Sequence, residues 1–271
     1  MDNAGKNVLL DLSTCTTSHF TERGGLSTDG NFDGYSTGAS YYYGKQKIQE
    51  LILPDAATST LSTTDAGNSA FGGIGFQTIS GANVVTIGQL SFYSHYELTS
   101  VDFPAVQTIE ESAFLYCDSL EVINLPSAQS IGIVAFGYCT NLTTVNLPAA
   151  TYIGNRAFYQ CNSLTTVNIP AAAFIGPSAF STTGATALTV TLGATRPTLA
   201  PGIFYEITTP KAVTVRVPSS SLNTYKSDYS DGIASAQNWG NAFRGKGWNG
   251  VAYIEPYSSV NTNISLIFEP Y

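Results

Sequence analysis

The chain has 271 residues, of which 43% are hydrophobic, so it is long enough to bury a sizeable core. Charged residues make up only 11% of it, and the formal net charge is -8. This acidic balance argues against nucleic acid and anionic membranes as partners, because both attract basic patches. No apolar stretch is long enough for a transmembrane helix or for the core of a signal peptide.

Residues 1–47 show no periodicity and are rich in Gly, Ser, Thr and Tyr, which predicts an N-terminal cap over whatever follows. Within them, the segment Asp29–Gly34 ("DGNFDG") fits the first half of an EF-hand calcium loop. The twelfth position of that loop should be Glu and is Ser40, and no flanking helices are apparent. We favour an ordinary turn over a calcium site, and we predict no metal and no cofactor.

From residue 48 to residue 218 the sequence repeats itself. One set of phenylalanines recurs at intervals of 22 residues: Phe92, Phe114, Phe136, Phe158 and Phe180. Leucine and isoleucine columns keep the same interval. An internal period of this length indicates a solenoid, in which each coil buries its apolar face against its neighbours. We predict about eight coils, with the domain of repeats spanning residues 48–218.

The segment "LTTVNLP" indicates the secondary structure of one coil. Val145 and Leu147 alternate with Thr144 and Asn146, which predicts a short strand with one buried face, and Pro148 ends it. We predict a right-handed, single-domain solenoid of the leucine-rich-repeat or β-solenoid class. Its short parallel strands would form one wall, and turns or short helical pieces the other. The alternative is a parallel β-helix with two or three strands per coil.

Three of the four cysteines, Cys117, Cys139 and Cys161, also recur every 22 residues, whereas Cys15 stands alone. Equivalent positions in stacked coils point the same way, which is unsuited to disulfide geometry. No C-x-x-C pair suggests zinc. We therefore predict a row of buried, free thiols.

The phrase "LTTVNLPAATYIGNRAFYQC" resembles the BspA-like leucine-rich repeats of bacterial surface proteins, also called the Treponema pallidum type. The resemblance extends from about Ile48 to Tyr225, and "VRVPSSSLNTYKSD" resembles the closing strand and short helix of that family. It implies a secreted or surface-anchored protein of anaerobic bacteria such as the Bacteroidetes, associated with adhesion. It implies no catalytic site and no defined ligand.

Residues 219–271 lose the period, and "NISLIFEPY" alternates Ile264, Leu266 and Phe268, which predicts a small β-rich C-terminal cap. The segment Gly245–Gly250 ("GKGWNG") matches a dinucleotide-binding pattern but lacks the required strand and helix around it. The aromatic residues of both caps are interpreted as apolar plugs rather than recognition sites. They are Tyr41, Tyr42, Tyr43, Trp239 and Trp248.

The sequence offers little for catalysis. Only His19 and His95 could act as bases near neutral pH, and we interpret His95 as a solvated turn residue. Asp102 and Glu121 could approach each other on neighbouring strands, but nothing predicts a cleft between them. We predict no catalytic residue and no enzyme; a hydrolase site in the irregular ends is the least favoured class.

The strongest binding candidates are the polar columns on the outward strand face. We predict a binding surface made of Asp102, Asn124, Thr144, Asn146, Thr166 and Asn168. Thr and Asn also stack well along parallel strands, so a structural role competes with binding.

We hypothesise a non-enzymatic recognition protein that is extracellular or on the outer-membrane surface, where a lipoprotein-type anchor would hold it. Its expected partner is a surface protein of a host or neighbouring cell, or else a glycan. The alternative is a glycan-binding accessory protein of a polysaccharide-uptake system.

Overall fold

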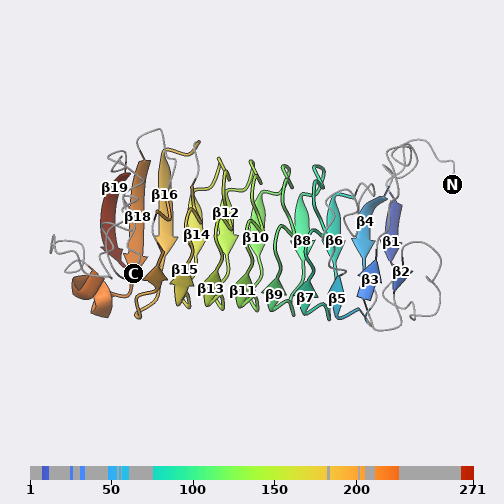
Figure 1. Cartoon of the computed structure of the whole chain (residues 1–271), viewed down its shortest axis with the longest axis horizontal. Coiled ribbons are helices and arrows are strands. Elements are labelled where there is room, and N and C mark those ends of the chain that lie inside the picture. The colour runs from blue at the N-terminus through green and yellow to red at the C-terminus, as the bar shows by residue number, and fades with distance from the viewer. Residues whose placement is uncertain are drawn as a thin grey trace.

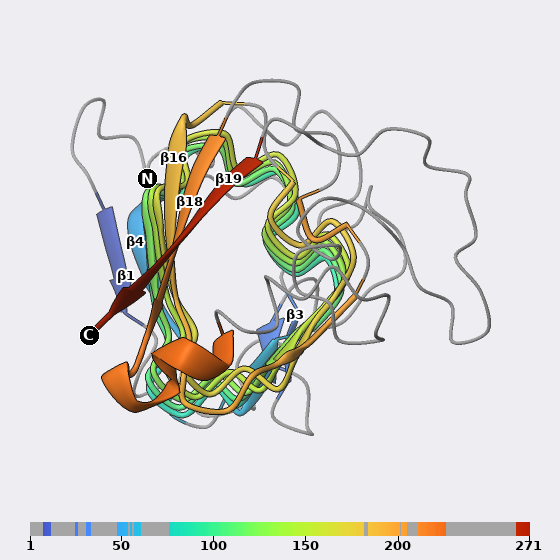
Figure 2. The ribbon, with the colours of Figure 1, turned by 90° about the vertical axis from the view of Figure 1, so that its left-hand side faces the viewer.

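The computed structural model describes residues 8–11, 25–26, 31–33, 48–53, 55, 57–60, 76–181, 184–200, 202–204, 211–225 and 264–271. Within these ranges the chain winds into an elongated solenoid whose strands follow one another along the long axis (Figure 1). Viewed along that axis, the coils superimpose on one another (Figure 2). The parallel-strand solenoid predicted from the period is thus confirmed.

The longer strands form the front wall, and all its pairs are parallel. Its first sheet contains β1 (Val8–Asp11), β4 (Ile48–Ile52), β6 (Thr78–Ser80) and β8 (Ser100–Asp102). The second sheet contains β10 (Val122–Asn124), β12 (Thr144–Asn146), β14 (Thr166–Asn168), β16 (Ala187–Thr191), β18 (Lys211–Val217) and β19 (Ile264–Pro270).

The second wall is built from very short strands, where we had expected turns or helical pieces. They are β2 (Gly25–Leu26), β3 (Asn31–Asp33), β5 (Ser59–Thr60), β7 (Thr86–Ile87), β9 (Thr108–Ile109), β11 (Ser130–Ile131), β13 (Tyr152–Ile153), β15 (Phe174–Ile175) and β17 (Thr198–Leu199). Pairing is parallel except between β2 and β3. From β7 to β15 each strand of this wall ends in a buried isoleucine. The short strands agree with our alternative of two strands per coil.

The solenoid has about six turns, slightly fewer than the eight coils expected, which correspond to the eight front-wall strands from β4 to β18 when the irregular end coils are included. The pairing of Thr144 with Thr166 reflects the regular 22-residue step of the central coils. At the C-terminal side the step lengthens, because Thr166 pairs with Thr189 and Thr189 with Thr214. At the N-terminal side Glu50 pairs with Thr78, so that coil contains an insertion. Irregular end coils were counted together with regular ones in our estimate.

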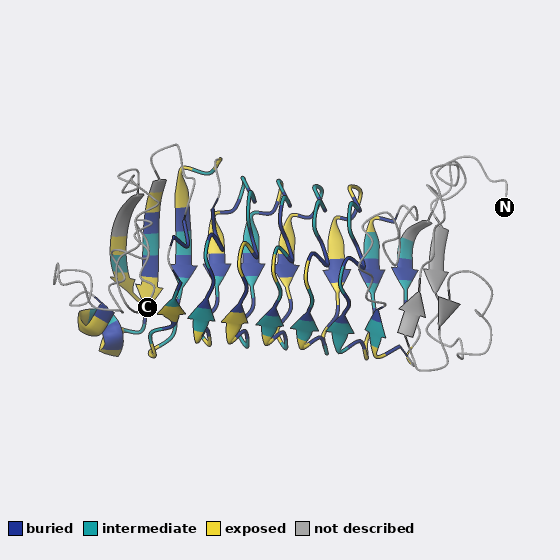
Figure 3. Cartoon of the chain, viewed as in Figure 1, coloured by how far each residue is buried: buried dark blue, intermediate teal, exposed yellow. Residues whose placement is uncertain are grey.

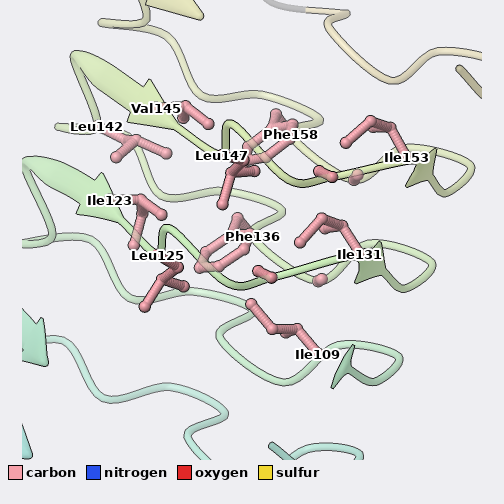
Figure 4. Close-up of a cluster of buried hydrophobic side chains, with 14 of the residues drawn as sticks. Ile109, Ile123, Leu125, Ile131, Phe136, Leu142, Val145, Leu147, Ile153 and Phe158 are labelled. Atoms are coloured by element: carbon pink, nitrogen blue, oxygen red, sulfur yellow. The ribbon is translucent and has the colours of Figure 1, made fainter. Parts of the chain in front are cut away.

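The core is a set of columns between the two walls, with buried and exposed residues alternating along the front strands (Figure 3). Val145 and Leu147 from the front wall and Ile153 from the second wall point into it (Figure 4). Between them, Phe136 stacks on Phe158 with ring centroids 5.4 Å apart and ring planes within 1° of parallel. Because every coil repeats these contacts, each coil buries its apolar side chains only when another coil is stacked against it.

Each cysteine of the repeated column is free and buried, as predicted. The thiol of Cys139 donates a hydrogen bond to the backbone carbonyl of Phe114, with an Sγ to O distance of 3.3 Å. Cys117 and Cys161 make the same contact to Phe92 and Phe136, at 3.1 and 3.0 Å. The row therefore binds each coil to the preceding one, while Cys15 lies outside the described residues.

We expect the thiols of this row to resist alkylation in the folded protein. Burial raises the pKa of the Cys117 and Cys139 thiols, so the reactive thiolate is scarce as well as inaccessible. In a Cys15→Ser background, Ellman's reagent at pH 8 should react at least about a hundredfold more slowly without urea than with it. Rapid release of three equivalents without urea would show that the row is open to solvent.

The front wall is interrupted between β8 and β10, where its hydrogen-bonded ladder divides into two sheets. Figure 1 shows these two strands farther apart than their neighbours, whereas β9 and β11 of the second wall remain paired. The outward residues of both strands are exposed at this interruption, including Asp102, Val122 and Asn124. The coils thus splay on one wall only.

The C-terminal end closes the front wall. After β18, a short helical turn at Ser219–Ser221 matches the closing helix expected from the family resemblance. The predicted terminal strand is confirmed as β19, which pairs in parallel with β18. Tyr271, the residue after β19, is anchored, because its hydroxyl donates to the Leu192 carbonyl at 3.1 Å. The other motifs considered in the two caps, including the calcium-loop side chains, His19 and both tryptophans, lie outside the described residues.

Candidate interaction surfaces

The asparagine column of the front wall forms a hydrogen-bonded ladder. Asn146 Nδ2 donates to Asn124 Oδ1 at 2.7 Å, and Asn168 Nδ2 donates to Asn146 Oδ1 at 2.6 Å. The three side chains are held by one another, and only Asn124, at the end of the ladder, falls in the fully exposed class. A ligand at this column would meet side-chain amides whose Nδ2 and Oδ1 atoms are already hydrogen-bonded to one another.

The remaining predicted site residues lie on the same outward face. Thr144 and Thr166 are directly opposite each other on β12 and β14, beside the asparagine ladder. Asp102 is exposed on β8, on the other side of the interruption in the front wall. Five of the six predicted residues therefore share one continuous sheet, and Asp102 belongs to its neighbour.

The adjacent threonine column is used for holding coils together. Thr143 Oγ1 donates to the carbonyl of Glu121 at 3.0 Å, and Thr165 Oγ1 donates to the carbonyl of Thr143 at 3.2 Å. Thr99 makes the equivalent bond to Gln77 at 3.0 Å. These hydroxyls satisfy backbone carbonyls of the preceding coil, which supports the structural role weighed for the polar columns.

A row of tyrosines lies in the turns of four successive coils, just after Phe92, Phe114, Phe136 and Phe158. Tyr116 and Tyr138 stack with ring centroids 4.8 Å apart, and Tyr93 and Tyr159 meet the two ends of this pair edge-on at 5.8 and 5.5 Å. All four are half-buried, and the guanidinium of Arg156 lies 5.2 Å from the centre of the Tyr159 ring. We call these four residues the tyrosine row.

Within the tyrosine row, the environment of Tyr116 favours its neutral hydroxyl group. Burial raises the pKa of Tyr116, and the hydroxyls of Tyr138 and Tyr93 raise it further. Burial also raises the pKa of the nearby Asp118 carboxyl. At neutral pH the Tyr116 phenol can therefore donate as well as accept hydrogen bonds, next to flat apolar ring surface.

Sequence reasoning missed this row because it does not keep one position. Tyr93 and Tyr159 directly follow the buried phenylalanine, whereas Tyr116 and Tyr138 come two residues after it. Tyr116 and Tyr138 also have positive φ values of 64° and 57°, unusual for residues of this size. A search for aromatics near one position in each coil, rather than at one position, would have found them.

The interpretation of His95 as a solvated turn residue is wrong. Its ring is buried, 5.0 Å from the ring of Phe76 and 5.9 Å from that of Phe92, measured between centroids. His95 follows Phe92 by the same three residues that separate Phe114 from Cys117. It therefore fills the first position of the cysteine column, where every side chain points inward.

The described residues contain no group of three or more His, Cys, Asp or Glu side chains placed to hold a metal ion. Among the same residues, no helix is both long and apolar enough to cross a membrane.

Stacked short coils with a leucine and a phenylalanine column define a leucine-rich-repeat solenoid. The family described as "BspA type Leucine rich repeat region" matches with six copies, over residues 36–150, 64–187 and 129–227. These matches together span well over half of the chain, so the chain belongs to this family. Comparison with curated proteins finds no match.

Three solved structures of bacterial leucine-rich repeat proteins are similar to this chain. The T. pallidum leucine-rich repeat protein is 20% identical with a TM-score of 0.49, covering 78% of this chain and 94% of that one. A leucine-rich cell surface protein from Faecalibacterium prausnitzii A2-165 is 20% identical with a TM-score of 0.46, covering 71% and 64%. A Bacteroides ovatus leucine-rich repeat protein is 18% identical with a TM-score of 0.43, covering 70% and 57%. The chain thus spans less than two thirds of the last two proteins.

Proposed function

We propose that this chain is a non-enzymatic recognition protein of the bacterial cell surface, which binds a protein of a host or neighbouring cell through the side of its solenoid. The cell-surface location rests on the resemblance to BspA-like proteins. The observation that supports recognition is the tyrosine row, which holds large amphipathic side chains in fixed positions across neighbouring coils. Binding proteins favour such side chains because they provide much contact area at little entropic cost.

The tyrosine row is a better interface than the asparagine ladder predicted from the sequence. The Asn124, Asn146 and Asn168 amides satisfy one another, so a partner must share or replace their hydrogen bonds. The phenol rings are stacked, and therefore already ordered, yet their outer edges remain accessible. Docking on them therefore orders few additional side chains.

The test is a panel of immobilised host matrix and bacterial surface proteins, followed by affinity measurement of each hit by biolayer interferometry. The double variant Tyr116→Ala, Tyr138→Ala should weaken binding at least about tenfold. The matched control Thr144→Ala, Thr166→Ala changes two outward residues of the front wall and should bind as the parent does. Urea unfolding of each variant verifies the fold. Unchanged affinity of the folded tyrosine variant would exclude the row as the interface.

The front-wall surface is tested by replacing Asn124, Asn146 and Asn168 together with Ala. Losing two side-chain hydrogen bonds should lower the free energy of unfolding by about 1–3 kcal/mol without unfolding the chain. Binding to the same partner should persist. A folded triple variant that no longer binds would instead place the interface on the asparagine ladder, as predicted from the sequence.

A further inference from the structure

A second aromatic pair lies on the outer face of the second wall, away from the tyrosine row. Tyr152 on β13 and Phe174 on β15 stack with ring centroids 5.2 Å apart and an interplanar angle of 12°. Their neighbours Ile153 and Ile175 are buried, so alternation places the two rings outside. They belong to a column of the wall whose other members from β5 to β17 are Thr and Ser.

The stack stops abruptly on one side. Ser130 is the register partner of Tyr152 in the preceding coil, and Thr108 is the partner of Ser130. The two rings stack from one coil to the next, so their faces are directed along the solenoid axis. Because the Ser130 side chain is small, it leaves uncovered the face of Tyr152 that is turned away from Phe174. Tyr152 accordingly remains 43% exposed although Phe174 covers its other face.

Along the solenoid axis, the space outside Ser130, between Tyr152 and Thr108, has the height of one coil. Strands in a ladder are about 4.8 Å apart, which is close to the 5.2 Å between the centroids of the stacked Tyr152 and Phe174 rings. A ring placed there would lie against Tyr152 on one side and the Thr108 side chain on the other. We call this position, bounded by Thr108, Ser130 and Tyr152, the ring shelf.

We propose that the ring shelf binds a pyranose ring of a neutral glycan. One face of a pyranose carries C–H groups that pack on an aromatic ring, while its hydroxyls point sideways toward polar neighbours. The rim supplies such neighbours in the hydroxyls of Thr108 and Ser130 and the exposed amide side chain of Gln129. An aromatic side chain of a protein would leave these polar groups unmatched. The net charge of -8 disfavours anionic sugars.

This site is separate from the proposed protein interface, because it lies on a strand column of the second wall, whereas the tyrosine row lies in turns and shares no residue with it. Either surface can therefore be removed without changing the other. Binding through the ring shelf would add a glycan specificity to the same solenoid.

Saturation-transfer NMR and calorimetry with cellohexaose, mannohexaose and chitohexaose test the proposal. N-acetyl-tryptophanamide serves as the aromatic probe. At least one oligosaccharide should bind the parent protein. Ser130→Tyr extends the aromatic stack into the shelf and should reduce that affinity about tenfold or more while preserving the fold. Tyr152→Ala should do the same by removing the platform.

The matched control is Thr86→Tyr, which adds the same side chain to the same column two coils away from Ser130. It should bind sugar as the parent does. Three outcomes would overturn the proposal: no oligosaccharide binds at millimolar concentration, Ser130→Tyr binds sugar undiminished, or the tryptophan derivative binds at the shelf while the sugars do not.

Discussion

Replacing Phe136 by Ala should lower the free energy of unfolding by roughly 3–5 kcal/mol. The ring is fully buried and has an aromatic neighbour on both faces, 5.0 Å from Phe114 and 5.4 Å from Phe158. Its removal leaves a cavity between two coils, and neither neighbour can shift far because each is itself stacked further along the row. Loss of apolar burial and loss of packing therefore add.

Urea unfolding followed by circular dichroism measures this effect. Phe136→Leu keeps most of the buried volume and loses the ring stacking, so it should cost only about 1–1.5 kcal/mol. Thr144→Ala, on the outer face of β12, should change stability by less than about 0.5 kcal/mol. A Phe136→Ala variant within 1 kcal/mol of the parent would show that the phenylalanine column does not hold the coils together.

The repeat period made the core predictable. Once Val145 and Leu147 are placed on the inner face of one strand, the 22-residue step places Ile123, Leu125, Val167 and Ile169 there as well, and all of them are buried. The same step correctly predicted the buried thiols at Cys117, Cys139 and Cys161. A solenoid is favourable for such reasoning because one coil's environment is that of the next.

The candidate sites were less predictable, since they arise where the repeat varies. The tyrosine row moves between two positions after the phenylalanine, and the Tyr152 and Phe174 pair replaces Thr or Ser in an otherwise polar column. His95 was misjudged because it keeps to the repeat: its position in the cysteine column, rather than the polarity of its ring, determines that it is buried. The interruption between β8 and β10 depends on how two coils pack, and no single coil shows it.

Deleting a whole coil in register should shorten the solenoid without unfolding it. Removal of residues 146–167 joins Val145 to Asn168, which restores the local sequence Thr-Val-Asn-Ile-Pro. Asn168 then takes the place of Asn146 opposite Asn124, and Phe180 takes that of Phe158 opposite Phe136. Since each coil contacts only its neighbours, the free energy of unfolding should fall by about the contribution of one interface between two coils. The urea m-value should decrease in proportion to the surface area that the missing coil no longer buries.

Removing one residue fewer is the decisive control. Deletion of residues 146–166 joins Val145 to Val167, so the strand gains one residue and every following side chain is displaced to the opposite face. Val167 and Ile169 would leave the core and Asn168 would enter it, at roughly 2–5 kcal/mol for each lost aliphatic residue. A bulge could absorb the extra residue only by breaking the ladder to β10. We expect this variant to lose cooperative unfolding while the 22-residue deletion keeps it. Equal stability of the two variants would mean that the strand register does not determine the fold.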